Sequence, residues 1–366
     1  MKLLVQPDDG IAPLLAAIKS AKKSIDILIF RMDWKELEAA LKAAVGRSIA
    51  VRALIAHTNH GGAQNLRNLE MRFLEAGVSV MRTADDLVRY HGKMLIIDRR
   101  TLYLLSFNFV HMDIDHSRGF GIVTKSAKVV QEAVKLFEAD ITRQAYTPGL
   151  NTFVVSPANA RKQLSTFIKR ARKQLLIYDP KINDPQIIRV LQDRAKAGVD
   201  VKIIGNIAGR STNLPATPLN TMHLHTRTII LDGHQAFVGS QSLRKLELDS
   251  RREIGIIIRD TKVVNTLLAT FEKDWAATGF ADSHAAAKED DAAPPQKMTE
   301  KEVRAFAKEL PPLTITVKEA IKKAVRKSGN ETLDHKEMAS TVKGAVKKAV
   351  KEAVKEMVRE KEKEGG

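Results

Sequence analysis

The chain has 366 residues, enough for about two domains and an appendage, and its 44% apolar and 28% charged residues are typical of a soluble globular protein. It contains no cysteine, which excludes disulfides, thiolate nucleophiles and thiolate metal sites and fits a reducing cytosol. The formal net charge is +17, and residues 281–366 hold 19 Lys and Arg against 16 Asp and Glu, so the basic excess lies in the first 280 residues. Such a body attracts polyanions, either phospholipid headgroups or nucleic acid, and the alternative is a basic surface with no polyanionic partner.

The sequence at the amino terminus does not read as a secretion signal, because Asp8 and Asp9 interrupt its short apolar run. No stretch approaches the roughly 20 consecutive apolar residues that a membrane-spanning helix needs. We therefore expect a cytoplasmic protein, whose contact with a bilayer would be peripheral at the inner membrane surface.

The chain reads as a tandem repeat. Segment 18–23, which leads into the apolar run 25–30, recurs 150 residues later as segment 168–173, which leads into 175–178. Each half is therefore predicted to run helix, strand, helix, strand.

A second block of the repeat carries polar residues and has an offset of 134. Since the two offsets differ by 16, the first half has a longer connection before residue 91, and the spacing of Leu66, Leu69 and Phe73 predicts a helix within it. The residues that recur at the second offset are His91, Asp98, Ser106, Arg118 and Gly121, which reappear as His225, Asp232, Ser240, Arg252 and Gly255.

Apolar runs at 94–97 and 228–231 are typical of buried strands. Strands that alternate with helices predict an α/β fold, with two tandem α/β/α halves related by a pseudo-twofold axis and a helical tail. We place the halves at 1–148 and 149–280.

Beyond residue 280 the composition shifts to Ala, Asp and Pro, which predicts a flexible linker over 281–298 and a charged helical tail over 299–366. Valine recurs every fourth residue from Val342 to Val358, opposite a Lys and Glu face. This helix is amphipathic, but its stripe has no Trp, Phe or Leu, so a solvated helix is favoured over one that binds a membrane or partner.

Two polar motifs share one spacing. In each, a histidine is followed by a cation at the second position, an aspartate at the seventh and a serine at the fifteenth. The first motif comprises His91, Lys93, Asp98, Ser106 and Asn108, and the second His225, Arg227, Asp232, Ser240 and Ser242.

Side chains two apart on an extended segment share a face, so each histidine should lie in one pocket with its cation. A phosphodiester resists attack because its oxygens are negative and its leaving alkoxide is poor. Two facing histidines can overcome both obstacles to the reaction. One attacks phosphorus to give a phosphohistidine, and the other protonates the leaving oxygen. Lysine, arginine, hydroxyl and amide groups can hold the remaining oxygens.

The paired motifs resemble those of the phospholipase D superfamily, in particular its bacterial cardiolipin-synthase-like members, over roughly residues 5–280. The resemblance implies two halves around one active site, a phosphohistidine intermediate, and hydrolysis or transfer without a cofactor or an obligatory metal. It also implies that one chain suffices for a complete site.

By the same resemblance His91 is the nucleophile and His225 the general acid and base. Lys93 and Arg227 are then catalytic cations, and the aspartates Asp98 and Asp232 secure local structure. The expected phosphate-binding residues are Ser106, Asn108, Ser240 and Ser242.

Some positions depart from the family pattern. Leu105 stands where the first motif has glycine, which would restrict how closely a phosphate approaches that backbone. In the family a carboxylate eleven residues beyond the asparagine position orients a histidine; Glu253 fills this position in the second half, and Gly119 in the first. Asp113 or Asp115 are candidate substitutes. The run from His111 to His116 also resembles a set of metal ligands, but nothing completes a site and an irregular surface loop is favoured.

Three functions stay open at this point. The first is a phospholipid phosphodiesterase or phosphatidyltransferase at a membrane surface, the second a nuclease with the same chemistry, and the third a lipid-binding or nucleic-acid-binding protein whose site has lost turnover. Aromatic residues make up only 5% of the chain and offer little for base stacking, so phospholipid is the preferred partner.

Overall fold

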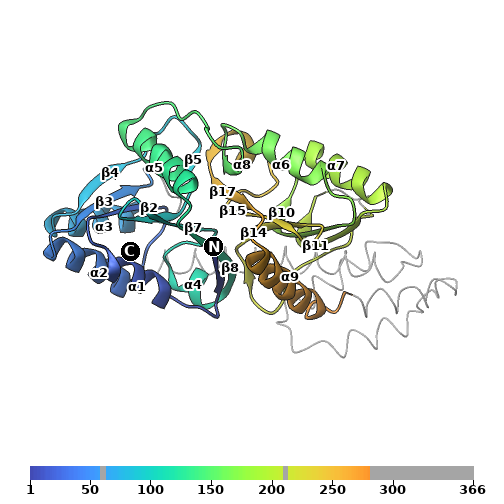
Figure 1. Ribbon diagram of the computed structural model, residues 1–366, viewed down its shortest axis with the longest axis horizontal. Helices are drawn as coiled ribbons and strands as arrows, with labels where there is room; N and C mark the ends of the chain where they lie inside the picture. Colours follow the sequence, from blue (N-terminus) through green and yellow to red (C-terminus); the bar gives the residue numbers. More distant parts are fainter. Residues whose placement is uncertain (58–62, 209–212, 281–366) are drawn as a thin grey trace, which may run out of the picture. The chain divides into compact units, whose positions relative to one another are not determined.

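The structure is a computed structural model that describes residues 1–57, 63–208 and 213–280. The linker and tail predicted beyond residue 280 lie outside the described residues. The body, Met1–Ala281, forms one compact unit that contains both repeats (Figure 1).

Each half is built on a mixed β-sheet whose strands occur in the same spatial order. The first sheet runs β1 (Lys2–Gln6), β8 (Ser117–Thr124), β7 (Thr101–Leu105), β6 (Met94–Ile97), β2 (Ser24–Ile29), β3 (Ala50–Ile55) and β4 (Ser79–Arg82). The second runs β9 (Phe153–Val155), β17 (Ile254–Ile258), β15 (Gln235–Gly239), β14 (Arg227–Leu231), β10 (Gln174–Ile182), β11 (Asp200–Ile207) and β12 (Ala216–Thr217). Within these two strand orders, the neighbours β2–β3–β4 and their counterparts β10–β11–β12 pair in parallel, and the other neighbours pair antiparallel.

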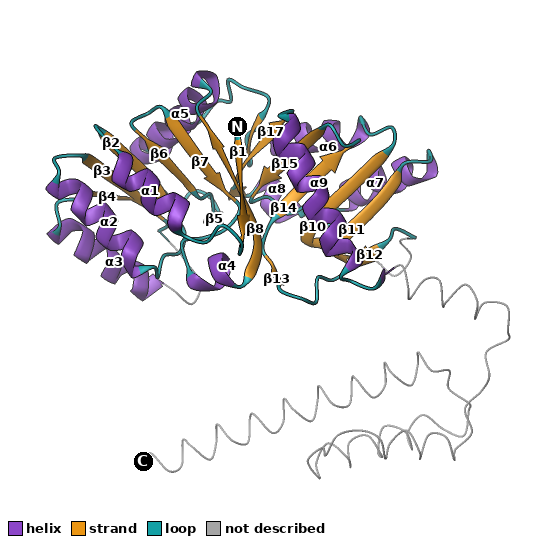
Figure 2. Ribbon diagram, turned by 60° about the horizontal axis from the view of Figure 1, so that its bottom comes forward, coloured by secondary structure: helices purple, strands orange, loops and turns teal. Residues whose placement is uncertain are grey.

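Helices cover both faces of each sheet (Figure 2). The outer helices of the first half are α1 (Ala12–Ser20), α2 (Lys35–Gly46) and α3 (Ala63–Glu75), and those of the second are α6 (Ala160–Lys169), α7 (Pro185–Lys196) and α8 (Lys245–Asp249). The inner helices, α5 (Ala127–Thr142) and α9 (Thr261–Ala276), pack with both sheets in one shared core. The predicted α/β class and tandem halves are confirmed.

Short strands pair across the boundary between the two halves, which we call the seam. β5 (Arg89–Tyr90) of the first half pairs in parallel with β16 (Arg251–Arg252) of the second. In return, β13 (His223–Leu224) of the second half pairs in parallel with the start of β8. Each exchanged strand ends directly before a motif histidine, so both histidines are held at the seam between the halves.

Buried ion pairs also cross the seam at equivalent positions. Arg118 of the first half contacts Asp274 of the second at 2.7 Å, and Arg252 of the second contacts Asp140 of the first at 3.1 Å. Burial raises the pKa of Asp140 to about 6, although Arg252 opposes the rise. Breaking a buried pair leaves an uncompensated charge, so these contacts fix the two halves in register.

Among the described residues, no helix is both long enough and apolar enough to cross a bilayer.

Candidate active site

The motif aspartates hold the turns that follow β6 and β14. Asp98 accepts backbone N–H groups from Lys22, Lys23 and Ser24 at 2.6–3.0 Å, and Asp232 accepts the equivalent three, from Arg172, Lys173 and Gln174, at 2.7–3.2 Å. Burial raises the pKa of each carboxyl, but these hydrogen bonds outweigh it and the pKa is lowered. Both aspartates therefore anchor the hairpin that follows the histidine to the start of the neighbouring strand, β2 or β10.

The serines of both motifs face the backbone of the next strand. The Ser106 hydroxyl accepts the N–H of Phe120 at 2.9 Å, and the Ser240 hydroxyl accepts that of Ile254 at 3.1 Å. Both residues are fully buried. Their hydroxyls fix the strand end that leads to Asn108 or Ser242, and phosphate binding by them stays a prediction.

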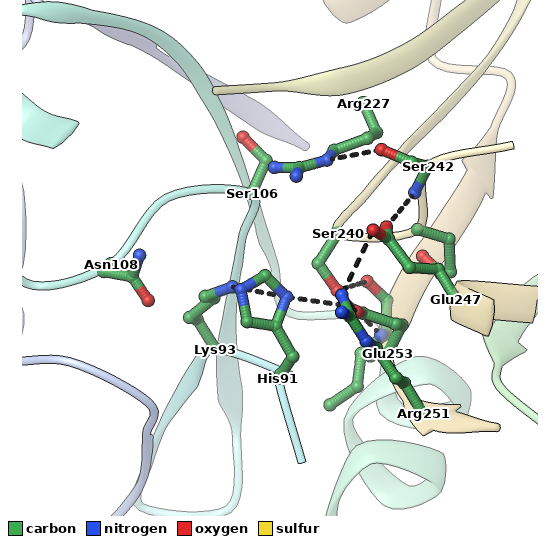
Figure 3. Close-up of polar contacts among 12 residues, drawn as sticks. His91, Lys93, Ser106, Asn108, Arg227, Ser240, Ser242, Glu247, Arg251 and Glu253 are labelled. Carbon is green, nitrogen blue, oxygen red and sulfur yellow. Dashed lines mark hydrogen bonds and ion pairs between the residues drawn. The ribbon is translucent and has the colours of Figure 1, made fainter. Parts of the chain in front are cut away.

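His91 lies against a carboxylate from the opposite half (Figure 3). Its Nδ1 is 2.8 Å from Oε2 of the fully buried Glu253, which immediately follows β16. A proton on Nδ1 is donated to this carboxylate, which leaves Nε2 as the atom with the free lone pair. The sequence selected Glu253 for this task, and the exchanged strands β5 and β16 place it there.

Lys93 lies beside the same imidazole. Its Nζ is 3.0 Å from Nδ1 and 2.9 Å from Nε2 of His91, so it is not aligned with the Nε2 lone pair alone. Burial lowers the pKa of Lys93 to about 7, with Glu253 opposing the shift and Arg227 adding to it. Burial, Lys93 and Arg227 also hold the pKa of His91 well below its usual range. His91 is thus a neutral imidazole at neutral pH.

His225 is held differently. Its Nδ1 is 2.8 Å from the carbonyl oxygen of Ser106, and its Nε2 is 3.2 Å from Oδ2 of Asp113. Asp113 also accepts the backbone N–H and the side-chain amide of Asn108 at 2.8 and 2.6 Å. A backbone carbonyl therefore orients His225 in place of the carboxylate that Gly119 cannot supply.

Asp113 is the carboxylate that sequence reasoning could not assign. It lies in a short helix, α4 (His111–Asp115), and not in the irregular surface loop that was expected. It is buried, and it contacts the ring nitrogen of His225 that remains for chemistry, whereas Asp115 is exposed and pairs with His111 at 3.1 Å. Its counterpart in the second half, Glu247, accepts the N–H of Ser242 in the same way, a repeat visible only once the two motifs are aligned.

The second cation makes contacts within its own half. Arg227 donates from Nε to the Ser242 hydroxyl at 3.2 Å and from its terminal nitrogen to the carbonyl oxygen of His225. Burial, Arg227 and Lys93 lower the pKa of His225 well below its usual range, with a contribution from His91. The two motifs thus lie close enough for their charges to influence each other across the seam.

Leu105 does not narrow the site. Its side chain is fully buried in the outer core of the first half, where its Cδ2 lies 2.8 Å from where a Cβ on Gly121 would be. The second half fills the equivalent space with Phe237 and Gln241, which leaves no room for a Cβ on Gly239. Leu105 of the first motif therefore fills space in the core beside Gly121.

Among the described residues no group of three or more His, Asp or Glu side chains is arranged to hold a metal ion. The histidine rings are nearly enclosed, with side chains 10% and 12% exposed for residues 91 and 225. Lys93 and Arg227 lie close enough to influence both rings, and two cations at this point favour an anionic group.

A family profile described as "Cardiolipin synthase, PLD-like domain" matches residues 14–141 and 164–275, one segment in each half. The chain belongs to the phospholipase D superfamily. Members of this superfamily are phosphodiesterases and phosphotransferases, and the paired histidine motifs place the chain within that chemistry.

Among solved structures, the fold is similar to polyphosphate kinase from Porphyromonas gingivalis, with 19% identity, a TM-score of 0.63 and coverage of 75% of this chain and 50% of that one. The chain thus spans half the length of that kinase. It is also similar to phosphatidylserine synthase from Haemophilus influenzae Rd KW20, with 12% identity, a TM-score of 0.55 and coverage of 75% and 85%. The phospholipase D family member Nuc from Salmonella typhimurium has 20% identity, a TM-score of 0.36 and coverage of 40% and 97%. No curated protein sequence matches the chain.

Proposed function

We propose that this protein cleaves or transfers phospholipid phosphodiesters through a phosphohistidine formed on His91. The contact between His91 Nδ1 and Glu253 carries the proposal, because it leaves a neutral imidazole whose lone pair is on Nε2, the atom that would attack. The carboxylate near His225, Asp113, contacts Nε2 itself, and the Nδ1 of His225 faces a carbonyl oxygen.

In the first step Nε2 of His91 bonds to phosphorus while the bond from phosphorus to the leaving oxygen breaks. His225 gives its Nε2 proton to that oxygen. Burial keeps resting His225 neutral, but a bound phosphate anion and the Asp113 carboxylate at 3.2 Å both favour the protonated ring. In the second step His225 takes a proton from water or an alcohol, whose oxygen displaces His91 from phosphorus.

Lys93 and Arg227 would hold the non-bridging oxygens throughout. Both cations flank the histidines, and Lys93 Nζ can leave the His91 ring for a phosphate oxygen that arrives beside it. Arg227 remains tied to Ser242 and so keeps its guanidinium in place.

Support for phospholipid as the substrate comes from the comparisons and from the charge of the chain. The matching family profile is named for cardiolipin synthase, and one similar fold is that of a phosphatidylserine synthase. The basic excess of residues 1–280 would also favour peripheral binding to an anionic membrane from the cytoplasmic side.

The test incubates the full chain with mixed phospholipid vesicles and, separately, with single- and double-stranded DNA. We expect released headgroup or exchanged alcohol from wild type, none from His91→Ala, and unchanged turnover in His234→Ala, which removes an exposed histidine elsewhere. Shortened DNA with intact lipid would select the nuclease, and silence of wild type on every substrate would favour a binding protein.

A further inference from the structure

Two arginines stand side by side next to the His91–Glu253 contact. In the parallel pairing of β5 and β16, Arg89 lies directly opposite Arg251. His91 and Glu253 follow one residue after the ends of these strands, two residues from each arginine, so on an extended backbone each arginine shares a face with the site residue that follows it. Like charges directly opposite each other are destabilising in a sheet, so this pairing calls for a compensating group.

Where the structure describes the chain, carboxylates lie within ion-pair distance of Arg251 but not of Arg89. Arg251 Nη1 lies 3.1 Å from Glu247 and 3.9 Å from Oε1 of Glu253, while its buried Nε has no hydrogen-bond partner among the described residues. The guanidinium of half-buried Arg89 forms no ion pair within the described part of the chain, and it lies 5.5 Å from the centre of the Phe30 ring. Burial lowers the pKa of Arg89, and Arg251 adds to that effect.

Phe30 connects this pair to the reaction centre. Its ring packs edge-on against His91, with 4.4 Å between ring centres, and Lys93 Nζ lies 5.3 Å from the same ring. Arg89 and the reactive imidazole therefore contact one aromatic side chain. Figure 3 shows Arg251 beside Glu253 on the same side of the site.

The other half has no such charge. The positions equivalent to Arg89 and Arg251 are His223 and Ser117, which also lie opposite each other and are joined by a contact of 3.2 Å between the hydroxyl and Nδ1. The additional cations are thus confined to the His91 side.

We propose that Arg89 and Arg251 form a second anion subsite, which takes another phosphate group of the substrate whose scissile phosphate is attacked by His91. This inference rests on the proposed function of the site. Arg89 and His91 are two residues apart on one strand, roughly 7 Å between Cα atoms. That separation suits a second phosphate joined to the first directly, as in a diphosphate, or through a short carbon linker.

The experiment measures binding of inorganic orthophosphate, pyrophosphate and 1,3-propanediol bisphosphate by calorimetry. The proteins are wild type, Arg89→Gln and the control Arg189→Gln, which removes the same charge from the exposed face of α7. We expect wild type and the control to bind a two-phosphate ligand about 10-fold more tightly than orthophosphate, and Arg89→Gln to lose this preference while its affinity for orthophosphate changes little.

A preference for pyrophosphate would indicate a diphosphate substrate, and one for the bisphosphate a carbon-linked pair. Equal affinities for all three ligands in wild type, or an undiminished preference in Arg89→Gln, would overturn the subsite. Turnover of phospholipid by wild type in either of those cases would leave the proposed function standing. Conversely, an Arg89-dependent preference in a protein that turns over no lipid would separate the subsite from the function.

Discussion

The two halves share the contacts that hold their motifs in place and differ in the surroundings of their histidines. The turn aspartates, the buried serines and the carboxylates that cap Asn108 and Ser242 recur with the same contacts in both. What surrounds the histidines does not recur, since His91 faces Glu253 and His225 faces a backbone carbonyl. The duplicated scaffold therefore places two histidines at one seam in unequal environments, as the proposed roles of nucleophile and acid require.

Removal of either cation, Lys93 or Arg227, is expected to cause the largest loss of activity. We expect Lys93→Met and Arg227→Met each to lower kcat/KM by about 10³-fold, because each removes a charge that holds the transferring group. Only Lys93→Met should also stabilise the fold, because it replaces a buried amine that makes no direct ion pair in the described part of the chain. Thermal unfolding of both variants checks this.

The stability of wild type relative to Lys93→Met should depend on pH. Burial sets the pKa of Lys93 at about 7 in the folded protein against 10.5 ordinarily, so the unfolded chain binds more protons between these values. Wild type should gain stability against the variant as pH rises from about 7 to 10. A difference that stays constant over that range would mean that Lys93 is not buried as a titrating group.

The carboxylates that contact the two histidines should differ in how much activity is lost when each is replaced. Glu253→Gln is expected to lower kcat by about 10²-fold with little change in KM, because the proton on His91 Nδ1 loses its charged acceptor. Asp113→Asn should cost about 10-fold, since Ser106 still orients His225. Asp115→Asn, an exposed carboxylate on the same short helix as Asp113, is the control and should match wild type. Equal losses of kcat in Glu253→Gln and Asp113→Asn would contradict the distinction drawn between the two histidines.

Gly92 shows a tighter fit in the first half than in the second, where Thr226 occupies its position. A Cβ on Gly92 would collide with the side chain of Ile254, the residue after Glu253. Gly92→Ala should therefore destabilise the fold by about 1–3 kcal/mol and lower kcat through displacement of Glu253. Urea unfolding together with kinetics checks both effects, and an unchanged kcat in a destabilised variant would show that Glu253 had not moved.

The last comparison concerns the stability of the fold, His225 and pH. Burial keeps the pKa of His225 well below the ordinary 6.5 in the folded protein. As pH falls below 6.5, His225 is therefore protonated in the unfolded chain while it stays neutral in the folded protein. Relative to His225→Gln, wild type should lose about 1.4 kcal/mol of stability per pH unit there. Denaturation of the two proteins at a series of pH values measures this slope, and parallel curves would contradict it.

The internal repeat made much of the fold and of the candidate site predictable from the sequence. Constant spacing gave the paired strands, the tandem halves and the residues that line the seam, because local periodicity and motif register are written in the chain. Glu253 could be selected by its family position, but its contact with the opposite half arises from the exchanged strands β5 and β16, which are only two residues long and carry no periodic signal. The role of the Ser106 carbonyl was not predictable, since every residue has one. Leu105 was misread because its direction depends on packing against Gly121.

The most direct test of the account is to find which histidine carries the phosphoryl group. Wild type would be quenched during turnover of a phospholipid and digested at alkaline pH, where phosphohistidine survives, and the peptides containing residues 91 and 225 would be compared by mass spectrometry. The account predicts the adduct on His91 in wild type and its accumulation in His225→Ala, which can no longer activate the acceptor. An adduct on His225, or one that persists in His91→Ala, would contradict it.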